Sequence, residues 1–130
     1  MKDSSFTAMT SNIQVDVTPI YLEEKSDPVN QKLVYAYFVT IINHSTEPIK
    51  ILARHWEIED SDGHVLTVDG EGIVGQQPTI QPGQEHEYNS FSVLKGYKGY
   101  MSGYYVAEND NGEHVKITIP RSLLLSHLLN

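Results

Sequence analysis

The sequence predicts an all-β domain folded as an antiparallel β-sandwich of about seven strands. Short segments rich in β-branched and aromatic residues dominate the chain from Asn12 to Pro120, and apolar and polar side chains alternate along several of them. Turn signals built from glycine, proline and asparagine separate these segments. No connection between them is long enough to hold the crossover helix that a parallel sheet requires. These three observations favour a sandwich of antiparallel strands.

The first half of the chain predicts three strands. Apolar and polar residues alternate over residues 13–19, which form the first strand. The second is a β-branched and aromatic run over residues 33–42 that ends at the turn-forming residues 43–45. Residues 49–58 alternate again and hold Trp56, which we expect in the core because an indole buries a large apolar area.

The second half predicts four more strands joined by turns. Residues 60–63, with the sequence Asp-Ser-Asp-Gly, and residues 109–112, with the sequence Asn-Asp-Asn-Gly, each have hairpin chemistry because glycine accepts positive φ. The four predicted strands are residues 65–68, 85–93, 100–107 and 113–119.

A length of 130 residues fits one domain with a packed core. We expect residues 1–130 to form this single domain, with residues 1–11 as a flexible N-terminus and residues 121–130 as a leucine-rich C-terminal tail. The tail is long enough for one or two helical turns and far too short to span a bilayer. We expect it to pack on a sheet edge or on a partner subunit.

Composition narrows the classes of partner and compartment. Nine Lys and Arg against seventeen Asp and Glu give a formal charge of −8, which opposes nucleic acid and anionic membrane surfaces. The absence of cysteine excludes disulfides, thiolate zinc sites and a cysteine nucleophile. Residues 1–12 lack the apolar run of a signal peptide. We therefore predict a cytoplasmic protein with no nucleic-acid partner, no membrane insertion and no cofactor.

Residues 70–75 match the G-x-G-x-x-G pattern that binds dinucleotide phosphates, but their surroundings do not fit. Pro78 and Pro82 prevent the helix that should open at the last glycine, and residues 88–107 lack the acidic partner for the ribose. Two interpretations stay open. The backbone amides form an anion-binding nest, with Arg54 as the nearest cation, or the glycines let a long connection turn sharply.

Five segments, in order, resemble the ApaG family: residues 54–58 (Arg-His-Trp-Glu-Ile), 62–63 (Asp-Gly), 70–78 (Gly-Glu-Gly-Ile-Val-Gly-Gln-Gln-Pro), 82–83 (Pro-Gly) and 99–105. The resemblance covers most of the chain. It implies a fibronectin type III-like or immunoglobulin-like sandwich and a bacterial protein associated with cobalt tolerance and magnesium efflux. Related domains in eukaryotic F-box and polymerase-interacting proteins imply protein binding, and the resemblance implies no enzymatic activity.

The candidate site residues surround the glycine-rich segment. They are Gly70, Gly72, Gly75, Gln77, Arg54 and His55. Strand alternation points His55 away from Arg54 and Trp56, toward solvent or a groove.

We predict no catalytic and no metal site. The chain contains no H-E-x-x-H spacing and no nucleophile elbow. Asp60, Asp62 and Glu71 match three positions of a calcium-binding EF-hand loop, but Val65 stands where that loop requires glycine. The tyrosines at positions 97, 100, 104 and 105 form either an exposed contact face or ordinary strand packing.

The leading function is a non-enzymatic module that binds a protein partner through a strand face or the rim of the glycine segment. The alternative is a sensor or hydrolase of a phosphate-containing ligand, such as pyrophosphate or a dinucleoside polyphosphate, that uses residues 70–75. A homodimer through a sheet edge or the leucine-rich tail is also open.

Overall fold

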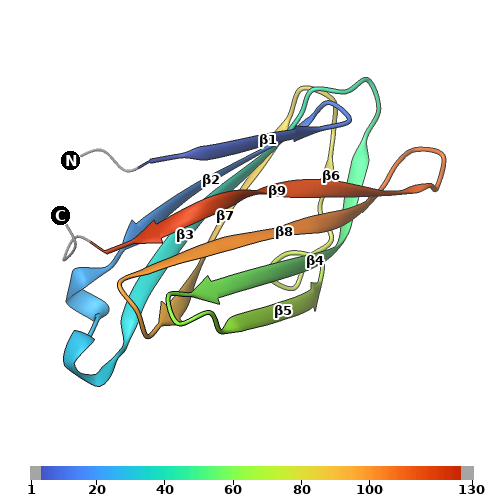
Figure 1. The fold of residues 1–130 in the computed structure, drawn as a ribbon. Coiled ribbons are helices and arrows are strands. Elements are labelled where there is room, and N and C mark those ends of the chain that lie inside the picture. The colour runs from blue at the N-terminus through green and yellow to red at the C-terminus, as the bar shows by residue number, and fades with distance from the viewer. Residues whose placement is uncertain (1–3, 127–130) are drawn as a thin grey trace.

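The computed structural model describes residues 4–126, and nine strands and two single-turn 3-10 helices form within them (Figure 1). The elements are β1 (Phe6–Thr10), β2 (Ile13–Tyr21), η1 (Glu23–Lys25), η2 (Pro28–Asn30), β3 (Leu33–Asn43), β4 (Ile49–Asp60), β5 (Val65–Glu71), β6 (Thr79–Ile80), β7 (Glu85–Leu94), β8 (Lys98–Glu108) and β9 (His114–Leu125). No helix in this part of the chain is long and apolar enough to cross a membrane.

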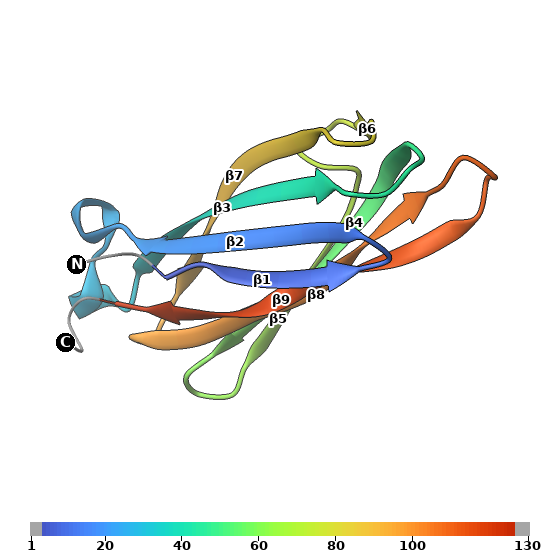
Figure 2. The same cartoon turned by 90° about the horizontal axis from the view of Figure 1, so that it is seen from above.

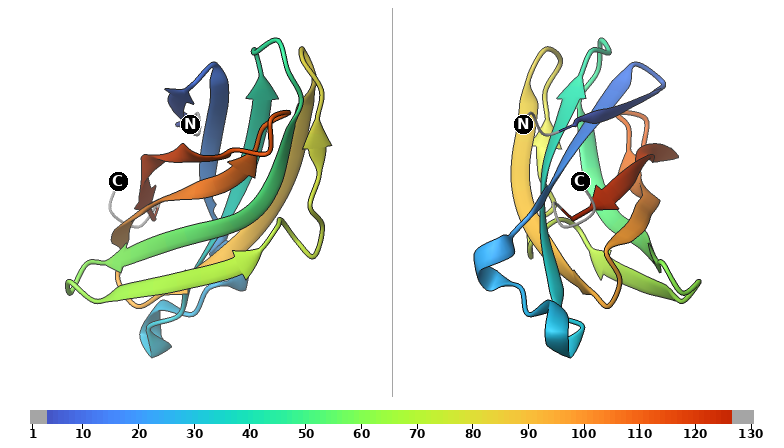
Figure 3. Two further views of the ribbon diagram at one scale, coloured as in Figure 1. Left: turned by 90° about the vertical axis from the view of Figure 1, so that its right-hand side faces the viewer. Right: turned by 60° about the vertical axis from the view of Figure 1, so that its left-hand side comes forward.

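The strands form two antiparallel sheets that pack face to face. One sheet has the order β1-β2-β3-β7, and the other has the order β5-β4-β8-β9 with β6 paired to β4. Side chains from both sheets fill the core between them, including Val15, Tyr35, Ile51, Trp56 and Tyr105. Figure 3 shows the two layers from two further sides. The predicted all-β sandwich is confirmed, and so is the burial of Trp56.

One side of the sandwich is closed by contacts between the sheets. Strand β9 packs along β1 and β2, and seen from above it lies beside β1 (Figure 2). The backbone amide of Thr118 donates to Oγ1 of Thr10 at 3.1 Å. On the opposite side, β5 and β7 each end their own sheet, and neither pairs with another strand on its outer edge among the described residues.

The N-terminal segment differs from the expectation of flexibility over residues 1–11. Phe6–Thr10 form β1, which pairs with β2 from Phe6 opposite Val17 to Thr10 opposite Ile13. The turn between them uses Ser11 and Asn12, both with positive φ (49° and 64°), which matches the right-handed twist of a tight hairpin. Residues 1–3 lie outside the described residues.

The expectation of a leucine-rich tail from residue 121 onward is also corrected. Strand β9 continues through Pro120 to Leu125, so residues 121–125 are neither a separate tail nor helical. The register between β8 and β9 shifts between Met101 and Gly103, so Pro120 falls where the ladder is interrupted and its missing N–H costs no ladder bond. Leu124 is buried in the core. Residues 127–130, the remainder of that segment, lie outside the described residues.

Candidate functional site

Strand β4 carries Arg54 and His55 to opposite faces of its sheet, as the alternation of a strand predicts. Arg54 lines the space between the two sheets, while His55 stacks on Tyr104 on the outer face. The six predicted site residues therefore do not form one site. Arg54 and Gly70 lie opposite each other on β4 and β5, and His55 belongs to a separate surface cluster. Gly72, Gly75 and Gln77 belong to the segment that follows β5.

Arg54 is held by the backbone of the glycine-rich segment. Strand β5 extends to Glu71, so Gly70 is a strand residue paired with Arg54. A Cβ atom at Gly70 would lie 2.5 Å from the Arg54 guanidinium carbon, so only glycine leaves this space to the guanidinium group. Nη1 of Arg54 donates to the carbonyl oxygens of Glu71 at 3.2 Å and Gly72 at 3.0 Å. Arg54, the cation nearest to the glycine-rich segment in sequence, is therefore bonded to two carbonyl oxygens of that segment.

The tip of the segment is a tight turn. The amides of Ile73 and Gln76 each donate to the other residue's carbonyl oxygen, at 2.6 and 2.9 Å. The two residues between them, Val74 and Gly75, have positive φ (47° and 76°), which is the geometry of a type I′ turn. A β-branched residue with positive φ is strained, by about 1–3 kcal/mol. Val74 is exposed at this tip, whereas Ile73 is buried in the core.

Several amides of the segment already have acceptors inside the protein. The Gly72 amide donates to the Leu52 carbonyl oxygen at 2.7 Å, and the Gln77 side chain donates to the same oxygen at 3.0 Å. Together with the paired amides of Ile73 and Gln76, these bonds remove donors that an anion nest would need. The bonding favours a structural role for the glycines.

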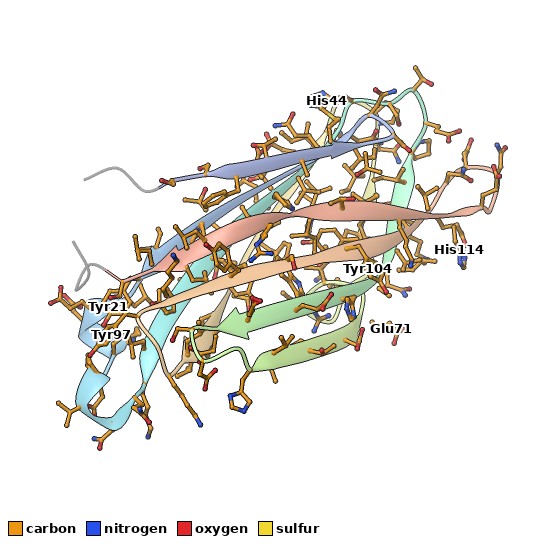
Figure 4. The ribbon with its side chains drawn as sticks, in the orientation of Figure 1. Tyr21, His44, Glu71, Tyr97, Tyr104 and His114 are labelled. Carbon is orange, nitrogen blue, oxygen red and sulfur yellow. The ribbon has the colours of Figure 1, made fainter. Side chains whose placement is uncertain are left out.

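His55 is the centre of a charged cluster on the outer face of the β5-β4-β8-β9 sheet. Its Nδ1 lies 2.6 Å from the Asp69 carboxylate, and its Nε2 lies 3.4 Å from that of Glu57. Its ring stacks on Tyr104 at 4.8 Å between centroids, and the Lys116 ammonium lies 4.5 Å from the Tyr104 ring centroid. Figure 4 labels Tyr104. The hydrogen bond that the His55 ring donates to the Asp69 carboxylate is the main cause that raises the pKa of His55 above its usual value.

The acidic residues that match a calcium loop have other roles. Asp60 accepts hydrogen bonds from the backbone amides of Ser61, Lys95 and Gly96 at 2.8, 2.8 and 3.0 Å. It therefore ties the β4–β5 turn to the β7–β8 turn. Within residues 4–126, no group of three or more histidine and acidic side chains is placed to hold a metal ion.

The tyrosines divide between core and surface. Tyr105 is fully buried, and its hydroxyl shares a hydrogen bond with that of Tyr88. Tyr100 and Tyr104 lie under the cationic groups of Arg121 and Lys116 on the outer face. The alternation of β8 therefore places Tyr105 in the core, where it packs, and Tyr100 and Tyr104 on the outer face, where they are available for contacts.

A groove of about 380 Å³ lies on the open side of the sandwich, between β5 and β7. Its apolar lining includes Trp56 and Ile58 of β4 and Leu66 and Val68 of β5, and Arg54 is the one charged residue that lines it within residues 4–126. Sequence reasoning missed this groove. The available signal is the pair of serines, Ser90 and Ser92, at alternate positions of β7 where larger apolar residues would fill the edge of the sandwich.

Residues 23–109 match the family model described as the ApaG domain. The Protein ApaG of Agrobacterium fabrum is 44% identical over 115 residues, which cover 88% of each chain, and that of Brucella canis is 40% identical over the same shares. A crystal structure of a protein from Bordetella pertussis aligns with a TM-score of 0.87 at 38% identity, over 92% of this chain and 98% of that one. The resemblance carried by residues 54–58 and 70–78 is confirmed, and this chain belongs to the ApaG family.

Proposed function

We propose that this chain is a non-enzymatic module that binds a protein partner in the cytoplasm. The supporting observation is a cluster of exposed apolar side chains around the groove between β5 and β7. Leu66 is 58% exposed and faces the groove from β5. Phe91, 67% exposed, and Val93, 51% exposed, lie at the rim of the groove on the outer face of β7. Clustered apolar exposure of this kind marks interaction sites, whereas single exposed apolar residues are ordinary.

The His55 cluster also favours binding over catalysis. Both ring nitrogens face carboxylates, and the ring stacks on Tyr104, so the imidazole is held in place by contacts within the protein. An association with cobalt tolerance or magnesium efflux would then be indirect, exerted through the partner.

The alternative, a sensor or hydrolase of phosphate-containing ligands, draws less support because the amides at residues 72, 73 and 76 bond within the protein. Titration with pyrophosphate, followed by NMR of the backbone amides, separates the two functions. We expect no saturable shift over residues 70–77.

Affinity capture from a cell lysate, with cross-linking, tests the proposal. We expect a specific protein to be recovered, identified by mass spectrometry and rebound by the purified chain in calorimetry. Leu66→Glu should abolish this binding because it places a charge among the apolar lining of the groove. Val29→Glu is the control, since Val29 is also apolar and exposed but lies in η2 and does not line the groove. Recovery of nothing above background, even after cross-linking, would refute the proposal.

A further inference from the structure

The four outer edges of the two sheets are not equally protected against pairing with another strand. Strand β9 carries Lys116, Pro120 and a shift in register, which are features that discourage edge pairing. Strand β1 is short and packs against β9. Strand β5 carries Asp69 and Glu71 toward its end.

Strand β7 carries charges only at its start, at Glu85 and Glu87, and otherwise lacks these protections. It has ten residues without proline or lysine, and its register with β3 runs without interruption from Leu94 opposite Leu33 to Glu85 opposite Ile42. Its last seven residues, 88–94, carry no charge. A regular edge with an uncharged stretch of this length is the kind that accepts an added strand.

The groove lies where the side chains of such an added strand would point. Alternate residues of a strand face opposite sides of its sheet, so every second side chain of a strand beside β7 would face the space between the two sheets. Ser90 and Ser92 leave that space open on the β7 side, and Leu66 and Val68 line it on the β5 side. At about 380 Å³ it falls within the range of about 300–1,000 Å³ typical of ligand pockets.

Arg54 gives the groove a charge preference. Among the described residues that line the groove, it is the one that is charged. Residues 55–94, which follow it, contain no Lys or Arg. Both of its hydrogen bonds within the described part of the chain come from Nη1. The donors on Nε and Nη2 are therefore available, and the planar guanidinium group suits a carboxylate.

Taking these observations together, we infer that an extended segment of the partner protein adds to the free edge of β7, fills the groove with alternate apolar side chains and places one carboxylate against Arg54. This inference rests on the proposed function and names the site and the chemistry of the partner.

A second copy of this chain fits the same edge less well. Paired through its own β7, it would present His86, Tyr88, Ser90, Ser92 and Leu94 on the inward face, with no carboxylate for Arg54. Each copy also has a formal charge of −8, which opposes association.

Synthetic peptides test the inference on the full-length chain. The probes are strands of about ten residues that alternate valine and threonine. In each, one inward valine is replaced by glutamate, at a different position in each peptide. We expect at least one peptide to give saturable amide shifts confined to β7, β5 and Arg54, with slower hydrogen exchange along β7. The matched peptide with glutamine in place of glutamate should bind about tenfold more weakly, because a charge-assisted hydrogen bond is lost.

A protein variant gives an independent readout. Ser92→Phe should fill the groove and abolish peptide binding. Thr67→Phe, on the exposed outer face of β5, should leave it unchanged.

Three outcomes overturn the inference: no peptide of the set binds, the glutamine peptide binds as tightly as the glutamate peptide, or light scattering shows a dimer that Ser92→Phe disrupts. In the capture experiment, a partner that Ser92→Phe still retrieves would overturn the inference and leave the proposed function standing. Failure of the unaltered chain to retrieve any partner would instead count against the proposed function.

Discussion

Gly72→Ala is expected to destabilise the protein more than Gly75→Ala, although both glycines have positive φ (60° and 76°) in the same segment. An alanine held in this left-handed region costs about 1–2 kcal/mol at either position. A Cβ atom at Gly75 meets no atom within 4 Å, so nothing is added there. A Cβ atom at Gly72 would overlap the carbonyl oxygen of Gln76 and lie 2.7 Å from its carbonyl carbon.

That carbonyl oxygen accepts the amide of the buried Ile73, so relief of the overlap also weakens a hydrogen bond of about 0.5–1.5 kcal/mol. The expected losses in the free energy of unfolding are about 1–2 kcal/mol for Gly75→Ala and about 1.5–3.5 kcal/mol for Gly72→Ala. Urea denaturation with linear extrapolation measures both. Equal losses for the two variants would refute the argument that the backbone around Gln76 fixes the conformation at Gly72.

Three further predictions concern other contacts. Asp69→Asn should lower the pKa of His55, measured by NMR of the imidazole. Because the pKa of His55 is raised in the folded state, its protonation adds stability below about pH 6.5, and this stability is lost as the pH rises through the folded pKa. The variant should therefore lose less stability across that range of pH than the unaltered protein. An unchanged pKa would contradict the assigned contact. Tyr88→Phe and Tyr105→Phe should each cost about 1–3 kcal/mol in urea denaturation because each leaves a hydroxyl of the pair without its partner, and the double variant should cost less than the sum. Simple additivity would argue against the shared bond. Asp60→Ala should cost about 1–3 kcal/mol and speed hydrogen exchange at the two amides that begin the β7–β8 turn, and unaltered exchange there would rule out the tie between the turns.

The sandwich could be predicted because its strands and turns leave patterns in short stretches of the sequence. Alternation at a period of two identifies strands, and the turns at residues 60–63 and 109–112 form as their sequences indicate, with the amides of Gly63 and Gly112 bonded back to Asp60 and Asn109. Strand β1 was missed because Ser11-Asn12 is a weaker turn signal than a glycine-containing pair, although asparagine tolerates positive φ. The extent of β9 was missed because proline at an interrupted position of an edge strand has the same sequence signature as proline at a strand end.

The candidate site was only partly predictable, because it depends on pairing between distant segments. Alternation correctly separates Arg54 from His55 within one strand. That Gly70 lies opposite Arg54, and that Asp69 lies opposite His55, follows from the register of β4 with β5, which no local pattern specifies. The groove depends further on which strands end their sheets, since Ser90 and Ser92 leave a space only because no strand lies beyond β7 among the described residues.

The glycine-rich segment and the groove are physically connected through Arg54. Gly70 leaves room for the guanidinium group, and the carbonyl oxygens of Glu71 and Gly72 orient it, so the motif that resembles a phosphate loop fixes a cation at the wall of the groove. Loss of partner binding in a Gly70 or Gly72 variant would therefore be explained by displacement of Arg54. Only a variant that leaves Arg54 in place, such as Gly75→Ala, tests whether the tip of the segment itself contacts the partner.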